Sequence, residues 1–495
     1  AHTPEPDKEH QWLRNFSSEE YSPRVPNYTV VVDPFESLGT WEGWGVSLCW
    51  WAHVLGERAT LADLFFGRKA VAIRGHKVPG LGFNIVRYNL GGSGWRSHKN
   101  ASMVPSPKIP PFKQVPGFWL DRHSHDPDSS SWDWTVDAKQ RAMMEMAKKR
   151  GADRFELFSN SPMWWMLKNH NPSGCDDSDV CNNLQRQNFR QFAEYLAVTT
   201  ARFKQEWGIT FTSVEPFNEP ISKWWTPSGT QEGCSFSRHA QALVIDMLAE
   251  EMAMRGLQDV PIAASDENTY DQAVETWSSF SDSTKAKVGK VNVHGYQYSS
   301  GRRDELYHAV EGKTLWLSEY GDGSESGMEM ANNLNLDFRY LHPTAWVYWQ
   351  AVDQAHGWGL LKATLGGSGP HKIRTVNTKL YILAQYTRHI RPGMTVIRSG
   401  AGHHVVAAYD KLGHKLVLVT ANYGTAQSVT YDLSRFAQVR GPMVRWCTNA
   451  GVDGDKYSEH HDLSLVGKTL TVRFEENTVQ TIELQNVTLD KMFVV

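Results

Sequence analysis

Two glutamates, each at the end of a short apolar run, are the strongest candidates for chemistry in this sequence. Glu219 follows the β-prone run over residues 211–217 and precedes Pro220, and Glu319 ends an apolar run that begins at Thr314. A short β-rich run closed by proline or glycine is typical of a buried strand that ends in a loop. Either glutamate alone could simply be a solvated acid at a strand end. The two together are what indicate a catalytic site.

The spacing of the two acids predicts a barrel. They are 100 residues apart (319 − 219 = 100), which leaves room for about three βα units at roughly 30 residues each. Two acids three strands apart fit strands 4 and 7 of a (β/α)8 TIM barrel, whose carboxyl-terminal face gathers catalytic groups. Paired carboxylates also serve to hydrolyse glycosidic bonds, since one donates a proton and the other carries negative charge.

The other β-prone runs complete this architecture. The remaining barrel strands are predicted over residues 43–48, 83–89, 154–159, 261–266, 290–296 and 345–350. The barrel then spans residues 41–390. From residue 391 to 495, apolar residues alternate at period two between turn residues, which predicts an attached antiparallel β-sandwich. Residues 1–40 are predicted as an extended arm over 1–26 and a strand, residues 27–33, that joins the sandwich. We expect the two domains to pack tightly, because no low-complexity linker separates them.

Six further segments carry a resemblance to glycoside hydrolase family 30. In chain order they are WEGWGVSLCWWA (residues 41–52), RYNLGG (87–92), SNSPMWWM (159–166), QEGC (231–234), VHGY (293–296) and YTRHIRPG (386–393). The first segment and QEGC are most similar to the fungal endo-β-1,6-galactanases of subfamily 5. The resemblance implies a retaining endo-glycosidase that hydrolyses the β-1,6-galactan side chains of arabinogalactan proteins, with no metal or organic cofactor.

The resemblance also implies roles for single residues. Glu319 is expected to attack the anomeric carbon and Glu219 to be the acid and base. We expect Glu219 to be protonated, because burial and the charge of Glu319 would both raise its pKa. Four residues are expected to hold this pair or the sugar: Arg87, Asn218, His294 and Tyr296. A structural ion pair for the arginine and a packed histidine are the alternatives.

Tryptophan is abundant, at 20 residues, and most of these side chains are expected in the core. Several lie near strand ends, where an aromatic face can stack on the C–H face of a sugar ring. The predicted platforms are Trp44, Trp164, Trp165 and Trp349. Glu232 in the QEGC segment is expected to be a solvated loop acid.

Composition excludes some classes of function and favours secretion. A net charge of −3 over 495 residues gives no electrostatic case for nucleic-acid binding, and no apolar run is long enough to span a membrane. The chain begins at Ala1 rather than Met, which resembles a processed start. Four sequons also favour a secreted glycoprotein, at Asn15, Asn27, Asn100 and Asn486. We expect a monomer whose partner is the polysaccharide.

The five cysteines allow at most two disulfides. Cys175 and Cys181 share a polar loop and are expected to form one of them, given the secreted interpretation. No Cys/His cluster has zinc-ligand spacing, and a metal-dependent hydrolase is set aside for want of a ligand cluster. The alternatives that stay open are a β-1,6-glucanase, xylanase or glucosylceramidase of the same family, and a non-catalytic carbohydrate-binding protein.

Overall fold

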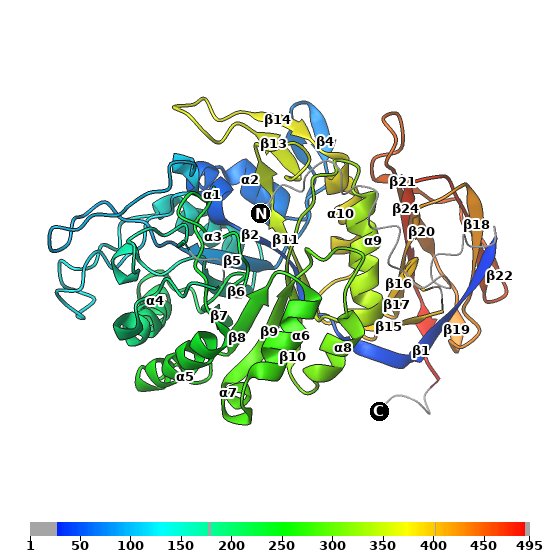
Figure 1. Ribbon diagram of the computed structural model, residues 1–495. Coiled ribbons are helices and arrows are strands. Elements are labelled where there is room, and N and C mark those ends of the chain that lie inside the picture. Colours follow the sequence, from blue (N-terminus) through cyan, green and yellow to red (C-terminus); the bar gives the residue numbers. More distant parts are fainter. Residues whose placement is uncertain (1–26, 177–179, 401, 491–495) are drawn as a thin grey trace.

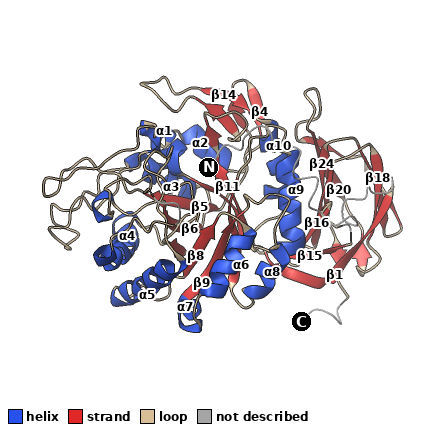
Figure 2. Cartoon of the chain, in the orientation of Figure 1, coloured by secondary structure: helices blue, strands red, loops and turns tan. Residues whose placement is uncertain are grey.

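The computed structural model describes residues 27–176, 180–400 and 402–490 of the chain. The arm predicted over residues 1–26 and the sequon at Asn15 lie outside this range. The described residues form a helix-covered barrel and, beside it, a curled β-sheet (Figures 1 and 2). Within these residues, no helix combines the length and the apolar character needed to cross a bilayer.

Eight parallel strands close into the predicted barrel, in the order β10-β11-β2-β5-β6-β7-β8-β9. They are β2 Gly43–Ser47, β5 Ile85–Leu90, β6 Arg154–Ser159, β7 Ser213–Glu215, β8 Ile262–Glu267, β9 Val288–His294, β10 Thr314–Tyr320 and β11 Ala345–Gln350. The fourth strand, β7, is shorter than predicted. The rings of Phe211 and Phe217 instead pack against Phe203 and Phe236, which lie outside the strand.

Helices cover the outside of the barrel. The α-helices are α1 Cys49–Leu55, α2 Ala59–Phe66, α3 Ala138–Lys149, α4 Phe189–Trp207, α5 Arg238–Met254, α6 Tyr270–Ser279, α7 Asp282–Lys287, α8 Arg303–Ala309, α9 Met328–Leu336 and α10 Thr378–Thr387. Helix α4 shows why they form: Phe192, Leu196 and Phe203 recur at helical spacing and are buried. Gly208 ends α4 at a φ of 62°, a left-handed conformation that glycine adopts without strain.

The second part is one ten-stranded sheet, in the order β21-β20-β24-β17-β16-β15-β1-β18-β23-β22. Its strands are β1 Tyr28–Thr40, β15 Thr395–Ser399, β16 Val405–Asp410, β17 Lys415–Asn422, β18 Gln427–Asp432, β20 Met443–Asn449, β21 Ser458–His460, β22 Leu465–Val466, β23 Thr469–Phe474 and β24 Thr478–Leu484. Strand β23 shows the predicted alternation, with Leu470, Val472 and Phe474 buried and their neighbours more exposed.

Strand β1 enters this sheet as predicted, and in Figure 1 it lies in blue beside the orange and red strands. It pairs antiparallel with β15 and parallel with β18. The sheet is therefore mixed, whereas a purely antiparallel arrangement was predicted. The reason is that β1 comes from the other end of the chain and is not tied to its neighbours by a hairpin.

Small sheets and short helical turns are attached to the barrel and the larger sheet. They are β3 Val71–Ile73, β4 His76–Val78, β12 Val352–Asp353, β13 Leu361–Ala363, β14 Ile373–Val376, β19 Gln438–Val439, β25 Val487–Thr488, η3 Pro111–Lys113, η4 Trp164–Met166, η5 Arg186–Asn188 and the π-helical η6 Asp337–Leu341. Cys175 and Cys181 form the predicted disulfide, and the other three cysteines are buried free thiols.

The barrel and the large sheet pack tightly, as predicted. The side-chain amide of Gln385, on α10, donates to Thr448 Oγ1 at 2.8 Å, and its backbone oxygen accepts from Thr481 Oγ1 at 2.6 Å. His389 Nδ1 lies 2.7 Å from Glu483 Oε1 across the same interface. Buried polar groups that are paired across an interface hold its two sides in one register.

Candidate active site

Glu219 lies just beyond the carboxyl end of β7 in an unusual backbone conformation. Its φ is 49°, in the left-handed region that costs a non-glycine residue free energy. The surrounding chain stabilises this conformation, because the backbone N–H of Glu219 donates to Asp266 O at 2.8 Å and its carbonyl accepts from Trp225 Nε1 at 2.8 Å. The side chain of Glu219 is therefore aimed by a backbone that two neighbouring segments hold in place.

Glu319 lies in β10, near its carboxyl end, at a shift in the register with β9. Both oxygens of its carboxylate are held by donors. Oε2 accepts from Arg87 Nη1 at 2.9 Å and Oε1 accepts from the Tyr296 hydroxyl at 2.7 Å. Burial and the charge of Glu319 raise the pKa of Tyr296, so its hydroxyl stays protonated and donates. The Glu319 carboxylate is therefore fixed in orientation.

The two carboxylates face one another across a short distance. An oxygen of Glu219 and an oxygen of Glu319 lie within 4.8 Å of each other, and a nitrogen of His294 lies within the same distance of both. Carboxyl groups about 5–5.5 Å apart are typical of retaining glycosidases, whereas inverting enzymes separate them by roughly 6.5–9.5 Å to admit a water. The geometry fits the shorter class.

Arg87, from β5, is the centre of the charge network below the two acids. Its guanidinium donates to Asp266 Oδ2 at 2.7 Å and to Ser47 Oγ at 2.7 Å, and it lies 3.3 Å from Glu156 Oε1. Burial alone would lower the pKa of Arg87, but Asp266, Glu319 and Glu156 together raise it. The arginine is at once a structural ion-pair partner and a support of Glu319.

His294, at the end of β9, joins the two acids. Its Nδ1 lies 2.9 Å from Glu219 Oε1, and its Nε2 lies 3.3 Å from Asp266 Oδ1 and 3.7 Å from Glu319 Oε2. Burial lowers the pKa of His294, but the charges of Glu319 and Asp266 outweigh burial and raise it to about 10. His294 is therefore a cation in the free protein at neutral pH.

This cation corrects the prediction for Glu219. Burial does raise the pKa of Glu219, but the hydrogen bond and charge of His294, helped by a hydrogen bond from Asn268 Nδ2 at 3.1 Å, lower it overall. Glu219 and His294 thus share one proton as a buried ion pair in the free protein. The prediction of a protonated Glu219 was wrong because it omitted the histidine, whose contact is not visible in the sequence.

Sequence reasoning missed Asp266, at the end of β8. Burial raises the pKa of Asp266, but Arg87 and His294 lower it to about 2, so it is anionic. Ser318 Oγ donates to it at 2.5 Å. The signal was available, since Asp266 is an acid at a predicted strand end like Glu219 and Glu319. Asn218 lies beside Glu219 and is buried, and its role stays a prediction.

The predicted tryptophans divide into two groups. Trp44 is fully buried, donates from Nε1 to Ile390 O at 2.7 Å, and packs against Phe338 and Tyr386, so it faces the helices outside the barrel. Trp164 is also fully buried. Neither ring has a face open to a sugar, which corrects the prediction for both.

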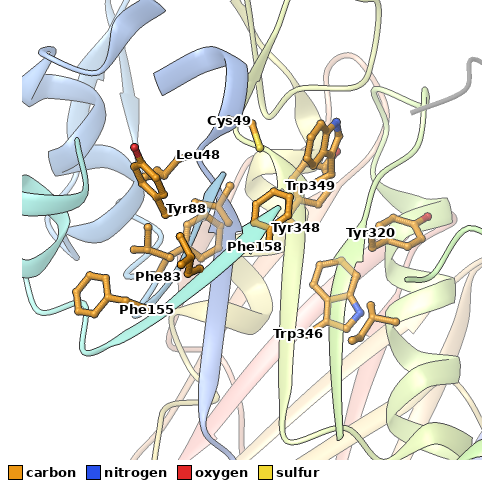
Figure 3. Close-up of a cluster of buried hydrophobic side chains, with 14 of the residues drawn as sticks. Leu48, Cys49, Phe83, Tyr88, Phe155, Phe158, Tyr320, Trp346, Tyr348 and Trp349 are labelled. Atoms are coloured by element: carbon orange, nitrogen blue, oxygen red, sulfur yellow. The ribbon is translucent and has the colours of Figure 1, made fainter. Parts of the chain in front are cut away.

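Trp165 and Trp349 keep a small exposed area, 4% and 3%, and their role stays a prediction. Figure 3 shows Trp349 at the upper end of β11, above Tyr348 and Trp346. Its ring meets Trp50 edge to face, with centroids 5.0 Å apart. Trp165 Nε1 donates to Trp119 O at 2.7 Å.

Glu232 is buried rather than solvated, contrary to prediction. Its carboxylate accepts from Gly92 N at 3.1 Å, Ser93 Oγ at 2.9 Å and Val115 N at 3.4 Å. Burial raises the pKa of Glu232 to about 8. The QEGC segment therefore binds the loop that follows β5, although Glu232 and Gly92 are 140 residues apart in the chain.

The expectation that ligand clusters are lacking also needs correction. Among the described residues, two groups bring three potential metal ligands within 4.8 Å of one another: Glu219, His294 and Glu319; and His98, Asp121 and His123. Both groups are assembled by folding from distant or loop positions, which spacing in the sequence does not reveal. The first group is the site described above, where Arg87 already supplies a positive charge to the carboxylates.

Comparison with known proteins places the chain in a family. Residues 27–291 match the model of O-glycosyl hydrolase family 30. An endo-β-1,6-galactanase of Hypocrea rufa is 51% identical over 466 residues, which cover 93% of this chain and 95% of that protein. An exo-β-1,6-galactobiohydrolase of Bifidobacterium longum is 25% identical over 430 residues, 66% of this chain and 27% of that one.

A solved structure shares the fold. The catalytic domain of the family 30 xylanase C from Talaromyces cellulolyticus superposes with a TM-score of 0.68 at 18% identity, covering 92% of this chain and all of that one. At this identity the likeness concerns the fold alone. The two facing glutamates, the matching family model and the half-identical relative lead to one conclusion: the chain belongs to glycoside hydrolase family 30.

Proposed function

We propose that this glycoside hydrolase is an endo-β-1,6-galactanase that cleaves the β-1,6-galactan side chains of arabinogalactan proteins with retention of configuration. The observation that carries the substrate is the identity of 51% with an endo-β-1,6-galactanase over 93% of the chain. The geometry that supports retention is the approach of Glu219 and Glu319 to within 4.8 Å.

In the first step, a carboxylate oxygen of Glu319 bonds to the anomeric carbon while the bond from that carbon to the leaving oxygen breaks. Arg87 and Tyr296 each hold one oxygen of Glu319, at 2.9 and 2.7 Å. Donors already in place need no reorganisation as charge moves during the reaction. Their contribution is to hold the nucleophile aimed at one point.

The leaving oxygen takes its proton from the pair formed by Glu219 and His294. The pair holds one proton across the 2.9 Å contact between His294 Nδ1 and Glu219 Oε1. When a sugar excludes water from the site, the charge-separated form becomes less favourable, and the proton moves to Glu219. Glu219 then delivers it to the leaving oxygen, so the carboxyl group acts as acid although its pKa is low in the free protein.

In the second step, a water replaces the departed sugar. The pair removes one proton from that water, its oxygen bonds to the anomeric carbon, and the bond from that carbon to Glu319 breaks. The proton given up in the first step is thereby recovered, and two inversions leave the configuration unchanged. None of these steps draws on a metal or an organic cofactor.

The substrate is tested by rates on β-1,6-galactan, β-1,6-glucan, β-1,4-xylan and β-1,3-galactan, measured side by side. Galactan should be cleaved far faster than the other three polymers if the site has hydrogen-bond partners for the axial hydroxyl of galactose. A sugar without that hydroxyl would leave these partners buried and unpaired, and the site would reject it. Comparable rates on glucan or xylan would overturn the substrate and leave the glycosidase. Absence of hydrolysis on all four would favour the carbohydrate-binding alternative.

The product pattern separates endo from exo action. An endo-enzyme releases galacto-oligosaccharides of several lengths at early times, whereas release of galactobiose alone would assign the exo mode named for the Bifidobacterium relative. Proton NMR of the first products reads the anomeric configuration directly. Initial formation of the α-anomer would contradict retention.

Secretion and a monomeric state complete the proposal. The Cys175–Cys181 disulfide and the exposed sequon asparagines Asn27, Asn100 and Asn486 support an oxidising, glycosylating compartment. Protein secreted from a fungal host should lose mass on removal of N-glycans. Light scattering should then give a mass near the 56.0 kDa of one chain, and a mass twice as large would refute the monomer.

A further inference from the structure

The second ligand group lies in the long loop between β5 and α3. His98, Asp121 and His123 come from separate parts of this loop, and their potential ligand atoms lie within 4.8 Å of one another. The imidazole rings of His98 and His123 meet edge to face, with centroids 4.8 Å apart. None of the three residues contributes to the hydrolytic mechanism above.

His98 is the feature that calls for a ligand. Its backbone is fixed by two hydrogen bonds with Ala101, at 2.8 and 2.9 Å, and only 6% of the residue is exposed. Both of its ring nitrogens are buried without a hydrogen-bond partner in the part of the chain that the structure describes. A buried imidazole normally donates from one nitrogen and accepts at the other. Two buried ring nitrogens that both lack a hydrogen-bond partner indicate a bound ion or water.

Asp121 is prepared as an anionic ligand. Its Oδ1 accepts from Ser131 Oγ at 2.6 Å and from the backbone N–H of His123 at 3.0 Å, which orients the carboxylate. Partners of this kind behind a metal ligand set its direction and strengthen binding. The side chain of His123 is 63% exposed and provides a route from solvent.

We propose that His98, Asp121 and His123 bind one zinc-type divalent cation. Two imidazoles and one carboxylate suit Zn²⁺, Ni²⁺ and Cu²⁺, whereas Ca²⁺ and Mg²⁺ prefer oxygen ligands alone. Three ligands also leave a fourth position for water. The cationic side chains of Arg96, Lys99 and Arg122 lie near the group and oppose a further positive charge. Affinity is therefore below that of a cysteine-rich structural zinc site.

The cation would tie together the two ends of the loop segment from residue 98 to residue 123. The loop that contains this segment follows barrel strand β5, whose carboxyl end lies on the same face of the barrel as Glu219 and Glu319. The ring of His98 lies 6.2 Å from that of Trp165, which in turn meets Trp119 at 5.3 Å. Binding would thus stiffen the rim of the active-site face without entering the reaction.

Zinc titration of metal-stripped protein, followed by calorimetry and metal analysis, tests this inference. Wild type should bind about one Zn²⁺ per chain and unfold at a higher temperature with zinc than without. His123→Ala should weaken zinc binding about 100-fold or more, since loss of a ligand exceeds the usual loss of an outer partner, and should abolish the zinc-dependent rise in Tm. Because His123 is exposed, this variant should fold normally.

His125→Ala is the matched control. His125 is two residues further along the same loop, its side chain is 57% exposed, and it pairs with Glu194 rather than with the ligand group. It should bind zinc like wild type. Equal zinc binding by both variants would place zinc elsewhere, for instance at Glu219 and His294, and overturn the inference. Absence of zinc binding by wild type would do the same and leave water as the partner of His98.

Discussion

The interior of the barrel and the core of the large sheet are equally buried but consist of opposite kinds of side chain. The sheet core is mainly apolar and includes Val30, Ile397, Leu418 and Val472. The barrel interior below the active site is charged: Arg87, Glu156, Asp266 and Lys290 are each at most 4% exposed. Replacing buried ion pairs by apolar groups is often neutral or stabilising. The charged layer is therefore better explained by positioning than by stability.

Strand β9 shows how positioning passes up the barrel. Lys290, Asn292 and His294 alternate along it and so point to one side. Lys290 Nζ lies 3.1 Å from the ring centroid of Trp316 and also contacts the carboxylate of Glu156. Asn292 Nδ2 donates to the same carboxylate at 3.0 Å. His294 contacts Glu219 above them. Lys290 and Asn292 therefore both hold Glu156, while His294 holds the catalytic pair above them.

The largest expected effect on turnover is that of Glu319→Ala. Loss of the nucleophile should lower kcat on β-1,6-galactan by about 10⁴-fold or more. Azide should restore cleavage of an activated β-galactoside and yield the α-galactosyl azide, since it enters from the side that Glu319 occupied. Glu325→Ala removes an acid that is 45% exposed and serves as the control. Hydrolysis of polymer by Glu319→Ala at a rate near wild type would contradict its role.

Glu219→Ala should have the next largest effect, and its size should depend on the leaving group. A general acid contributes about 10²–10⁴-fold, so polymer hydrolysis should fall by that much. Formation of the glycosyl-enzyme from an aryl galactoside with an acidic phenol should be nearly unchanged, because that leaving group needs no proton. Azide should here give the β-galactosyl azide. Equal losses on both substrates would argue against Glu219 as the acid.

His294→Gln should change how the free energy of unfolding depends on pH. The pKa of His294 is raised from 6.5 to about 10 by its acidic neighbours. Its stabilising contribution is therefore complete below pH 6.5 and is lost as the pH rises towards about 10. The free energy of unfolding, measured by denaturant titration, should fall more steeply in wild type than in His294→Gln across this window. Parallel curves would show that His294 is not a buried cation.

The sequence predicted the barrel well but could not distinguish its two sides. Strands β6 and β11 begin and end at the predicted residues, and both acids lie at predicted strand ends. Parallel barrel strands are buried on both faces, so alternation does not separate inward from outward positions. That is why Trp44 was predicted at the sugar and lies against the helices. The partners of Glu219 and Glu232 depend on contacts between distant segments, which one sequence does not display.

Leu418→Ala, in the sheet core, should have the smallest effect on turnover and a large one on stability. Leu418 is fully buried on β17, between β16 and β24. Its truncation leaves a cavity and should lower the free energy of unfolding by about 2–5 kcal/mol. Because no ion pair among the described residues joins Leu418 or its apolar neighbours to the acids, kcat at 25 °C should stay within about twofold of wild type.

Leu412→Ala makes the same change on a side chain that is 95% exposed, close to β17. It should alter the free energy of unfolding by no more than about 0.5 kcal/mol, so the pair measures burial alone. If Leu418→Ala lowered kcat in proportion to stability, the sheet would be acting on the site. The sheet would then contribute to positioning, through interface contacts such as those of Gln385 and His389.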